Sequence, residues 1–266
     1  MMHLHPIISF SLIFILGAIF GSFLNVVIYR VPKKMSIIFP ASHCFNCKIP
    51  IKFFDNIPLL GYFLLKGKCR NCGAEFPSRY AFIELITSLL TIIIYIIYGI
   101  STSFFIYLAL AYLLIAVTFV DIDHFIIPNG FIGIGIVILI IGVYLKWIPI
   151  DWTEAASGAF VFAGFLFTIG IIGQFILKKE SIGFGDVKLG LVLGGFLGVE
   201  YSILALYLSF ALSAIYVFVM LGAKLIKKSA KIPFGPYLAA GSLIALFTTS
   251  PSGGNYILNW YYLTMF

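Results

Sequence analysis

The chain has 266 residues, of which 62% are hydrophobic and only 10% are charged, and its formal net charge is +7. An average soluble domain carries about 25% charged residues, so this composition excludes a soluble globular fold and indicates a chain that crosses the membrane several times. The positive charge does not indicate nucleic-acid binding, because lysines and arginines beside membrane spans act as topology signals. We therefore expect membrane lipids, and no nucleic acid, among the partners.

Apolar runs of the length that spans a bilayer recur along the chain. Counted by that rule, they predict an all-α polytopic membrane protein with about eight transmembrane helices. The first covers residues 7–29, and a polar loop from Arg30 to Arg79 follows it. The others lie near residues 81–98, 104–120, 126–145, 156–177, 187–199, 201–221 and 236–248. The run at 187–199 is short and rich in glycine, so we expect it to tilt or to be buried among other helices.

The distribution of basic residues predicts the orientation. If the polar loop is cytoplasmic, alternating spans place sixteen of the seventeen lysines and arginines on the cytoplasmic side, with only Lys146 outside, as the positive-inside rule requires. Beyond the loop these residues are Lys178, Lys179, Lys188, Lys224, Lys227, Lys228 and Lys231. Both termini then lie outside. No small-x-small cleavage site follows the first apolar run, so we expect an uncleaved span and a multi-pass protein of the inner (plasma) membrane.

Four cysteines form two C-x-x-C pairs in the polar loop, Cys44 with Cys47 and Cys69 with Cys72, separated by 21 residues. That separation lies just outside the usual four-thiolate zinc spacing. Thiolates bind zinc tetrahedrally, and a short loop with few large apolar residues needs such a staple to keep one shape. A cytoplasmic loop argues against disulfides. The sequence predicts a structural zinc site; free thiols or a redox pair are the alternatives.

Acidic residues at span ends form a second candidate site. Asp121 and Asp123 end the third span and Asp186 begins the sixth, and the topology places all three at the cytoplasmic face. Ionisable groups in membrane segments are functional by default. Two close carboxylates share one proton, so that one activates water while the other protonates a carbonyl, as in aspartic proteases. Alternatively, Asp121 and Asp123 cap helix ends or pair with Lys188, or the acids carry protons in a transporter.

Six short motifs, taken in order, resemble the type IV prepilin peptidase family, the bifunctional leader peptidases and N-methyltransferases of the GxGD aspartic protease class. The motifs are Gly21 to Arg30, the two cysteine pairs, Arg79-Tyr80 with Glu84, Asp121-Ile122-Asp123 with Ile127-Pro128, Gly183 to Lys188, and Pro233 to Pro236.

This resemblance implies that Asp121 and Asp186 are the catalytic pair, with Asp123 a neighbouring acid. It implies prepilin or pseudopilin substrates, which are cut after a glycine at the cytoplasmic face. The new N-terminal amine is then methylated from S-adenosylmethionine. We accordingly divide the chain into a first span (1–29), a zinc-binding loop with the N-methyltransferase part (30–80) and a seven-span peptidase core (81–266). The alternatives are a peptidase without methylation, or a zinc-stapled transport or assembly protein.

Two positions depart from the family pattern. The family often has Pro-Asp where this chain has Pro128-Asn129, which removes a third acid but keeps the pair, and Phe45 replaces a proline between the first two cysteines. No G-x-G-x-x-G fingerprint marks a nucleotide site, so no residue is assigned to the methyl donor. Glu84 is either a contact for a cationic donor or amine, or a helix-start acid. Asn25 is expected to form a helix–helix hydrogen bond.

Overall fold

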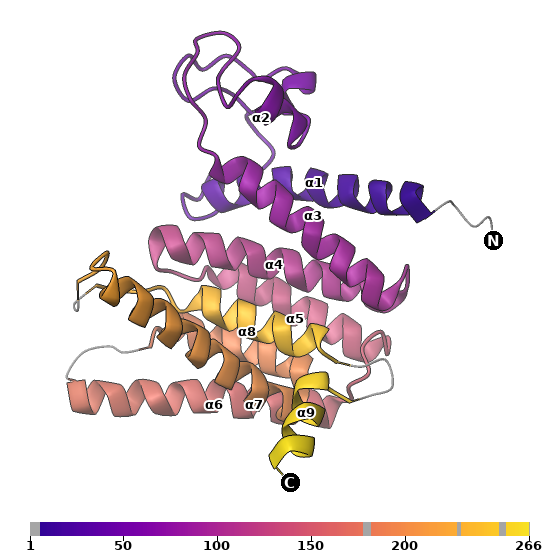
Figure 1. Ribbon diagram of the computed structural model, residues 1–266, viewed down its shortest axis with the longest axis vertical. Coiled ribbons are helices and arrows are strands. Elements are labelled where there is room, and N and C mark those ends of the chain that lie inside the picture. The colour runs from indigo at the N-terminus through magenta and orange to yellow at the C-terminus, as the bar shows by residue number, and fades with distance from the viewer. Residues whose placement is uncertain (1–5, 178–181, 228–229, 250–253, 266) are drawn as a thin grey trace. The chain divides into compact units, whose positions relative to one another are not determined.

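The computed structural model describes residues 6–177, 182–227, 230–249 and 254–265 (Figure 1). Lys178, Lys179 and Lys228, which contribute to the predicted charge asymmetry, lie outside these described residues. Within the described ranges the elements are helices, with no strand among them. They are α1 (Pro6–Arg30), η1 (Phe53–Asn56), α2 (Leu60–Leu64), α3 (Arg79–Tyr98), α4 (Thr102–His124), α5 (Asn129–Tyr144), α6 (Trp152–Leu177), α7 (Phe184–Gly222), α8 (Gly235–Phe247) and α9 (Tyr256–Met265). The predicted all-α class is confirmed.

Five of these helices, α1, α3, α4, α6 and α7, are long and apolar enough to cross a membrane, and α5 and α8 are shorter apolar helices. The eight predicted runs fall on seven of these helices, because α7 contains two helical segments that meet at a kink, and these segments correspond to the runs at 187–199 and 201–221. The backbone of Gly198 interrupts this helix with φ 67° and ψ −174°. Such a conformation suits glycine and few other residues. The polytopic architecture is confirmed, and the number of spans stays a prediction.

The chain divides into two compact units, residues 1–104 and 105–266. In the first unit α1 packs against α3, and glycines permit their close approach. A Cβ atom added to Gly21 would lie 2.7 Å from the Cα atom of Glu84. At this crossing Asn25 Nδ2 donates a hydrogen bond to the carbonyl of Tyr80 at 3.1 Å. The helix–helix hydrogen bond expected of Asn25 is confirmed.

The second unit is organised around α7, against which α6, α8 and α5 pack (Figure 1). Gly158 of α6 meets Gly194 of α7 so closely that a Cβ atom on either would collide with the backbone of the other. A Cβ atom on Gly190 would lie 3.0 Å from Cδ1 of the Phe162 ring. Small residues at such crossings let helix backbones touch in a membrane, where packing replaces the hydrophobic effect. The run at 187–199 is therefore buried among other helices, as its glycines predicted.

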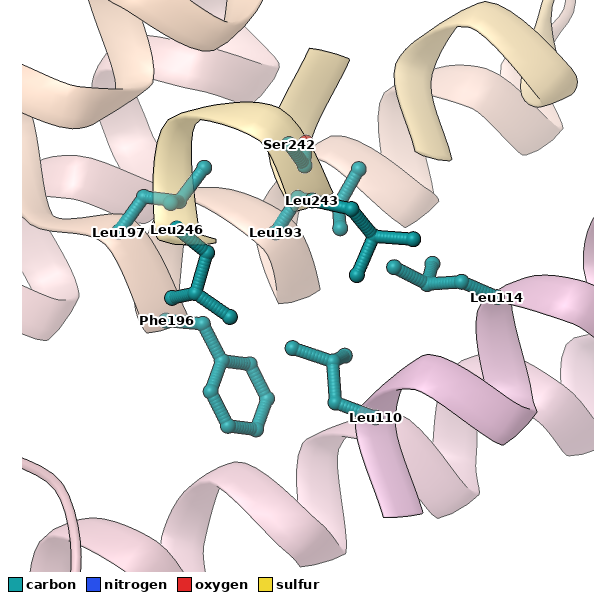
Figure 2. Close-up of a pocket in the computed structure, with 8 residues that line it drawn as sticks. All are labelled: Leu110, Leu114, Leu193, Phe196, Leu197, Ser242, Leu243 and Leu246. Atoms are coloured by element: carbon teal, nitrogen blue, oxygen red, sulfur yellow. The ribbon is translucent and has the colours of Figure 1, made fainter. Parts of the chain in front are cut away.

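Leucines fill the space where α4, α7 and α8 converge (Figure 2). The remaining void is about 10 Å³, at the lower limit of what a single bound water requires. The Ser242 hydroxyl at its edge is buried without a hydrogen-bond partner. This part of the second unit is a packed core without space for a larger ligand.

Candidate functional site

The two acids assigned from the sequence lie at helix ends of the second unit. Asp121 stands in the last turn of α4 and is 5% exposed, and Asp186 stands in the first turn of α7 and is 8% exposed. Asp123, two residues after Asp121, is exposed. The structure thus buries Asp121 and Asp186 at two helix ends of the same unit and leaves Asp123 at the surface.

The start of α8 fixes the Asp121 carboxylate. The N–H group of Gly235 donates a hydrogen bond to Asp121 Oδ2 at 2.9 Å, and Pro236 follows within the first turn of the helix. A Cβ atom on Gly235 would lie 2.8 Å from that same oxygen. Position 235 must therefore be a glycine, because a side chain there would collide with the Asp121 carboxylate. Sequence reasoning missed this role, although a glycine before a proline is a recognisable signal of a helix start.

Glycines also surround Asp186. Its backbone N–H donates to the carbonyl of Gly183 at 3.0 Å, and a Cβ atom on Gly183 would lie 3.2 Å from Asp186 Oδ2. A Cβ atom on Gly185 would lie 3.2 Å from Cβ of Ile127, in the segment before α5. The absence of a side chain at Gly183 lets the Asp186 carboxylate lie against the backbone, and its absence at Gly185 lets α7 approach Ile127.

The sequence analysis considered an ion pair of Lys188 with Asp121 or Asp123, but the structure gives this lysine another partner. Its ammonium donates to Asn129 Oδ1 at 2.9 Å and lies over the Phe184 ring, 4.9 Å from the ring centroid. Asn129 is the position at which the family often has an acid. The lysine therefore interacts with a neutral amide, and the Asp121 carboxylate interacts with the α8 backbone.

The cysteine loop brings all four thiols of the first unit together, with every Sγ atom within 4.8 Å of the others. Cys44 Sγ and Cys72 Sγ are 3.7 Å apart, and Cys47 Sγ and Cys69 Sγ are 4.0 Å apart. Four sulfurs bonded tetrahedrally to zinc at about 2.3 Å would stand roughly 3.8 Å from one another. The cluster therefore has the dimensions of a four-thiolate metal site.

Both C-x-x-C segments adopt the same backbone turn. The N–H of Cys44 donates to the carbonyl of Ile49 at 3.0 Å, and the N–H of Cys69 donates to that of Ala74 at 2.8 Å. The residue after each second cysteine, Lys48 or Gly73, has a positive φ of 60° or 71°. Two equivalent turns thus present four sulfurs to one point.

Hydrogen bonds to sulfur favour the thiolate form at two of these positions. The backbone of Ala74 lowers the pKa of the Cys72 thiol to about 6, and the backbone of Cys47 lowers the pKa of the Cys44 thiol. The thiolate is the form that binds metals.

An ion pair ties the second cysteine turn to the loop. Arg70, between Cys69 and Cys72, donates from Nε to Asp55 Oδ2 at 2.9 Å and from Nη2 to Oδ1 at 2.6 Å. These hydrogen bonds hold the pKa of the Asp55 carboxyl below its usual range. The planar fork matches the carboxylate in a way that a lysine would not. Arg70 therefore links the second cysteine pair to η1, which contains Asp55.

A cavity of about 950 Å³ lies between this loop, α1 and α3. Glu84 lines it, 8% exposed, and its Oε2 atom accepts a hydrogen bond from the N–H of Leu59 at 2.7 Å. Arg30, 6% exposed, closes the start of the loop by donating to the carbonyls of Ser36 and Pro40 at 2.9 and 2.7 Å. Ligand pockets usually have volumes of roughly 300–1,000 Å³, so this one can hold a nucleoside-sized molecule.

Buried acids at the ends of apolar helices, in a polytopic chain with a separate cysteine cluster, are the features of a membrane aspartic peptidase. Two family models match the chain in succession. The bacterial peptidase A24 N-terminal domain matches residues 15–98, and the type IV leader peptidase family matches residues 108–218. The chain belongs to the type IV leader peptidase family, and the resemblance noted in its motifs is confirmed. It is accordingly a multi-pass protein of the inner membrane.

Curated relatives match over nearly the whole chain. A prepilin leader peptidase/N-methyltransferase of Aeromonas salmonicida (strain A449) is 32% identical over 98% of this chain and 96% of its own length. The protein of the same name from Pseudomonas aeruginosa is 30% identical over 91% of each chain. A type 4 prepilin-like proteins leader peptide-processing enzyme of Escherichia coli O78:H11 is 32% identical over 87% of this chain and 91% of its own length. No solved structure matches.

Proposed function

We propose that this chain cleaves the short basic leader from type IV prepilins or pseudopilins at the cytoplasmic membrane face, and then N-methylates the new N-terminal residue. The observation that carries the peptidase assignment is the pairing of buried Asp121 and Asp186 at the ends of α4 and α7. The relatives named above are prepilin leader peptidases and N-methyltransferases.

The proposed cleavage uses both carboxyl groups. One carboxylate takes a proton from a water molecule, which attacks the carbonyl carbon of the scissile peptide bond. The other, protonated, carboxyl donates its proton to the carbonyl oxygen, and two acids in one site divide these roles because they share a proton. The N–H of Gly235 holds Asp121 Oδ2 in place. When the tetrahedral intermediate collapses, the carboxyl that took the proton from water passes it to the leaving amine, and the other carboxylate recovers a proton from a hydroxyl of the intermediate.

The cysteine loop has a structural role in this proposal. Cys44, Cys47, Cys69 and Cys72 would hold a zinc ion that stabilises the loop. A site with four protein thiolates has no open position for water, so the ion would take no part in either reaction. S-adenosylmethionine would supply the methyl group. We assign the N-methyltransferase activity to the loop at 30–80 together with the adjoining ends of α1 and α3. The peptidase core occupies residues 81–266, the loop faces the cytoplasm, and both termini lie outside.

The test is to incubate the purified protein in lipid or detergent with a prepilin and S-adenosylmethionine, and to weigh the products by mass spectrometry. We expect a mature product that carries one added methyl group. Cleavage without the methyl group would reject the second activity. An uncut prepilin, with folded and metal-loaded protein, would reject the peptidase and favour a transport role for the acids.

Gly235 gives a further prediction for the peptidase. Gly235→Ala places a methyl group against Asp121 Oδ2, and a displacement of about 1 Å in a catalytic group lowers rates by roughly 100-fold. We expect a loss of that size in the cleavage rate. Gly164→Ala is the matched control, because a Cβ atom there meets no atom within 4 Å. Equal cleavage by the two variants would show that the start of α8 does not position Asp121.

A further inference from the structure

The cavity of the first unit changes in character along α1. At one end it is lined by Ile15, Ile19 and Phe23, which are 52%, 53% and 48% exposed on the apolar part of the helix. Towards the C-terminal end of α1 the polar residues Ser22, Asn25 and Arg30 join the lining, among Phe23, Val26 and Tyr29. An elongated molecule with an apolar body and a polar end would match this lining.

Two oxygen acceptors meet at the polar end. Asn25 is 8% exposed, and because its Nδ2 atom donates to the Tyr80 carbonyl, its Oδ1 atom is fixed as an acceptor. That Oδ1 atom is buried without a hydrogen-bond partner. Asn25 is one of the residues that line the cavity. Buried polar atoms in folded proteins are nearly always hydrogen-bonded, so its unpaired acceptor indicates a missing donor.

Glu84 supplies the second acceptor and a negative charge. Its carboxylate receives hydrogen bonds from the Leu59 N–H and from the Ser22 hydroxyl. No lysine or arginine of the described residues forms an ion pair with it, since the ion pairs found there join Lys68 with Glu75 and Arg70 with Asp55. A buried carboxylate without a cation is costly, so the immediate surroundings of Glu84 favour a cationic group. The basic residues that line the same cavity, Arg30, Lys48, Lys52, Lys68 and Arg70, form no ion pair with it.

We infer that this cavity is the methyl-transfer site, and that Asn25 and Glu84 bind the α-amine of the cleaved substrate. The inference rests on the proposed N-methyltransferase activity. A mature pilin-like chain begins with an amine at the end of an apolar helix, so its body fits the lining at Ile15, Ile19 and Phe23. Its ammonium group supplies the donors that Asn25 Oδ1 lacks and the positive charge that Glu84 lacks.

The chemistry requires a neutral amine. Glu84 takes one proton from the bound ammonium, and Asn25 Oδ1 keeps a second N–H oriented. The freed nitrogen lone pair then attacks the methyl carbon of S-adenosylmethionine as the carbon–sulfur bond breaks, and the electron pair of that bond stays on sulfur. The product is a secondary ammonium, the former sulfonium is a neutral thioether, and one proton remains on Glu84.

The test measures binding in the absence of any methyl donor. The probes are two synthetic peptides of a mature apolar N-terminal segment, one with a free α-amine and one with an acetylated α-amine. The unmodified protein should bind the free-amine peptide about 10-fold more tightly, in keeping with a hydrogen bond to a charged group. Glu84→Gln should abolish this preference, and Asn25→Ala should reduce it. Glutamine can still accept the Leu59 N–H, so the loop contact is retained.

A second readout uses the complete reaction. In Glu84→Gln the ratio of methylation rate to cleavage rate should fall about 100-fold, the lower end of what a lost proton acceptor costs. Glu75→Gln is the matched control, an exposed acid of the same loop that pairs with Lys68 and does not line the cavity. It should change neither the peptide preference nor the ratio.

The outcomes separate this inference from the proposed function. If Glu84→Gln prefers the free amine as strongly as the unmodified protein does, the amine site is wrong, whatever the methylation assay shows. If the unmodified protein cuts prepilin and adds no methyl group, the proposed methyltransferase activity is wrong. Metal content equal to that of the unmodified protein shows that the loop of each variant is folded.

Discussion

Asp186→Asn is expected to abolish prepilin cleavage, with a loss of about 10³- to 10⁴-fold, the scale of proton transfer by a positioned side chain. Asparagine keeps the size of the side chain and its place in the first turn of α7, but it cannot carry the proton that the pair shares. Asp121→Asn should show the same loss, since each acid needs the other. The measurement is the rate of prepilin processing by purified variants, followed by mass spectrometry.

Asp123→Asn is the matched control, because Asp123 lies two residues from Asp121 and is exposed, whereas Asp121 is 5% exposed. It should cut prepilin at nearly the unmodified rate. The double variant of Asp121 and Asp186 should be no slower than either single variant, because residues that act as a unit are not additive. Persistent cleavage by Asp186→Asn, or an equal loss in Asp123→Asn, would contradict the assignment of the pair.

Removal of the metal is expected to abolish methylation before it affects cleavage. Zinc binding contributes about 10–16 kcal/mol to small thiolate-stapled folds, and the loop around Cys44 has few other buried side chains. A strong chelator, or Cys44→Ser at a position that is 1% exposed, should leave the loop open to proteolysis. The measurements are zinc content per chain, loop cleavage by a protease, and the two activities side by side.

Readdition supplies the control for this experiment. Zinc should restore protection of the loop and methylation in the chelated protein, and magnesium should not, because it prefers oxygen ligands. Cys44→Ser should not recover with either ion. Full methylation by a protein shown to be free of metal would remove the structural role of the cysteine cluster.

Much of the fold could be predicted because the bilayer imposes a length and an apolar character on each helix. The apolar runs therefore located the seven longest helices to within a few residues, and they separated residues 187–199 from 201–221, where the non-helical backbone of Gly198 interrupts α7. They did not predict α9 (Tyr256–Met265). They also could not show the kink itself, because it depends on the backbone angles of Gly198, which a hydropathy pattern does not contain.

The candidate site divides in a similar way. Residues that are chemically rare in a membrane protein, such as Asp121, Asp186 and the four cysteines, stand out from the sequence. Gly235 does not stand out, because its role rests on a backbone N–H that only the packed structure places. The hydrogen bond of Asn25 between helices could be predicted, whereas its unpaired Oδ1 atom could not. Glu84 was left undecided for the same reason, since its choice of partners depends on the loop that folds against α3.

The contact between Gly158 and Gly194 has a consequence for how such a protein can change over time. Asp186 lies on α7, and at Gly158 and Gly194 the backbone of α7 touches the backbone of α6 directly, without a large side chain between them. Residues on the outside of the same helices, such as Phe160 at 78% exposed and Phe175 at 81% exposed, have no part in that contact. Lineages that live in membranes of different thickness or lipid content can therefore exchange these outer residues freely, while a single methyl group at position 194 would move the acid.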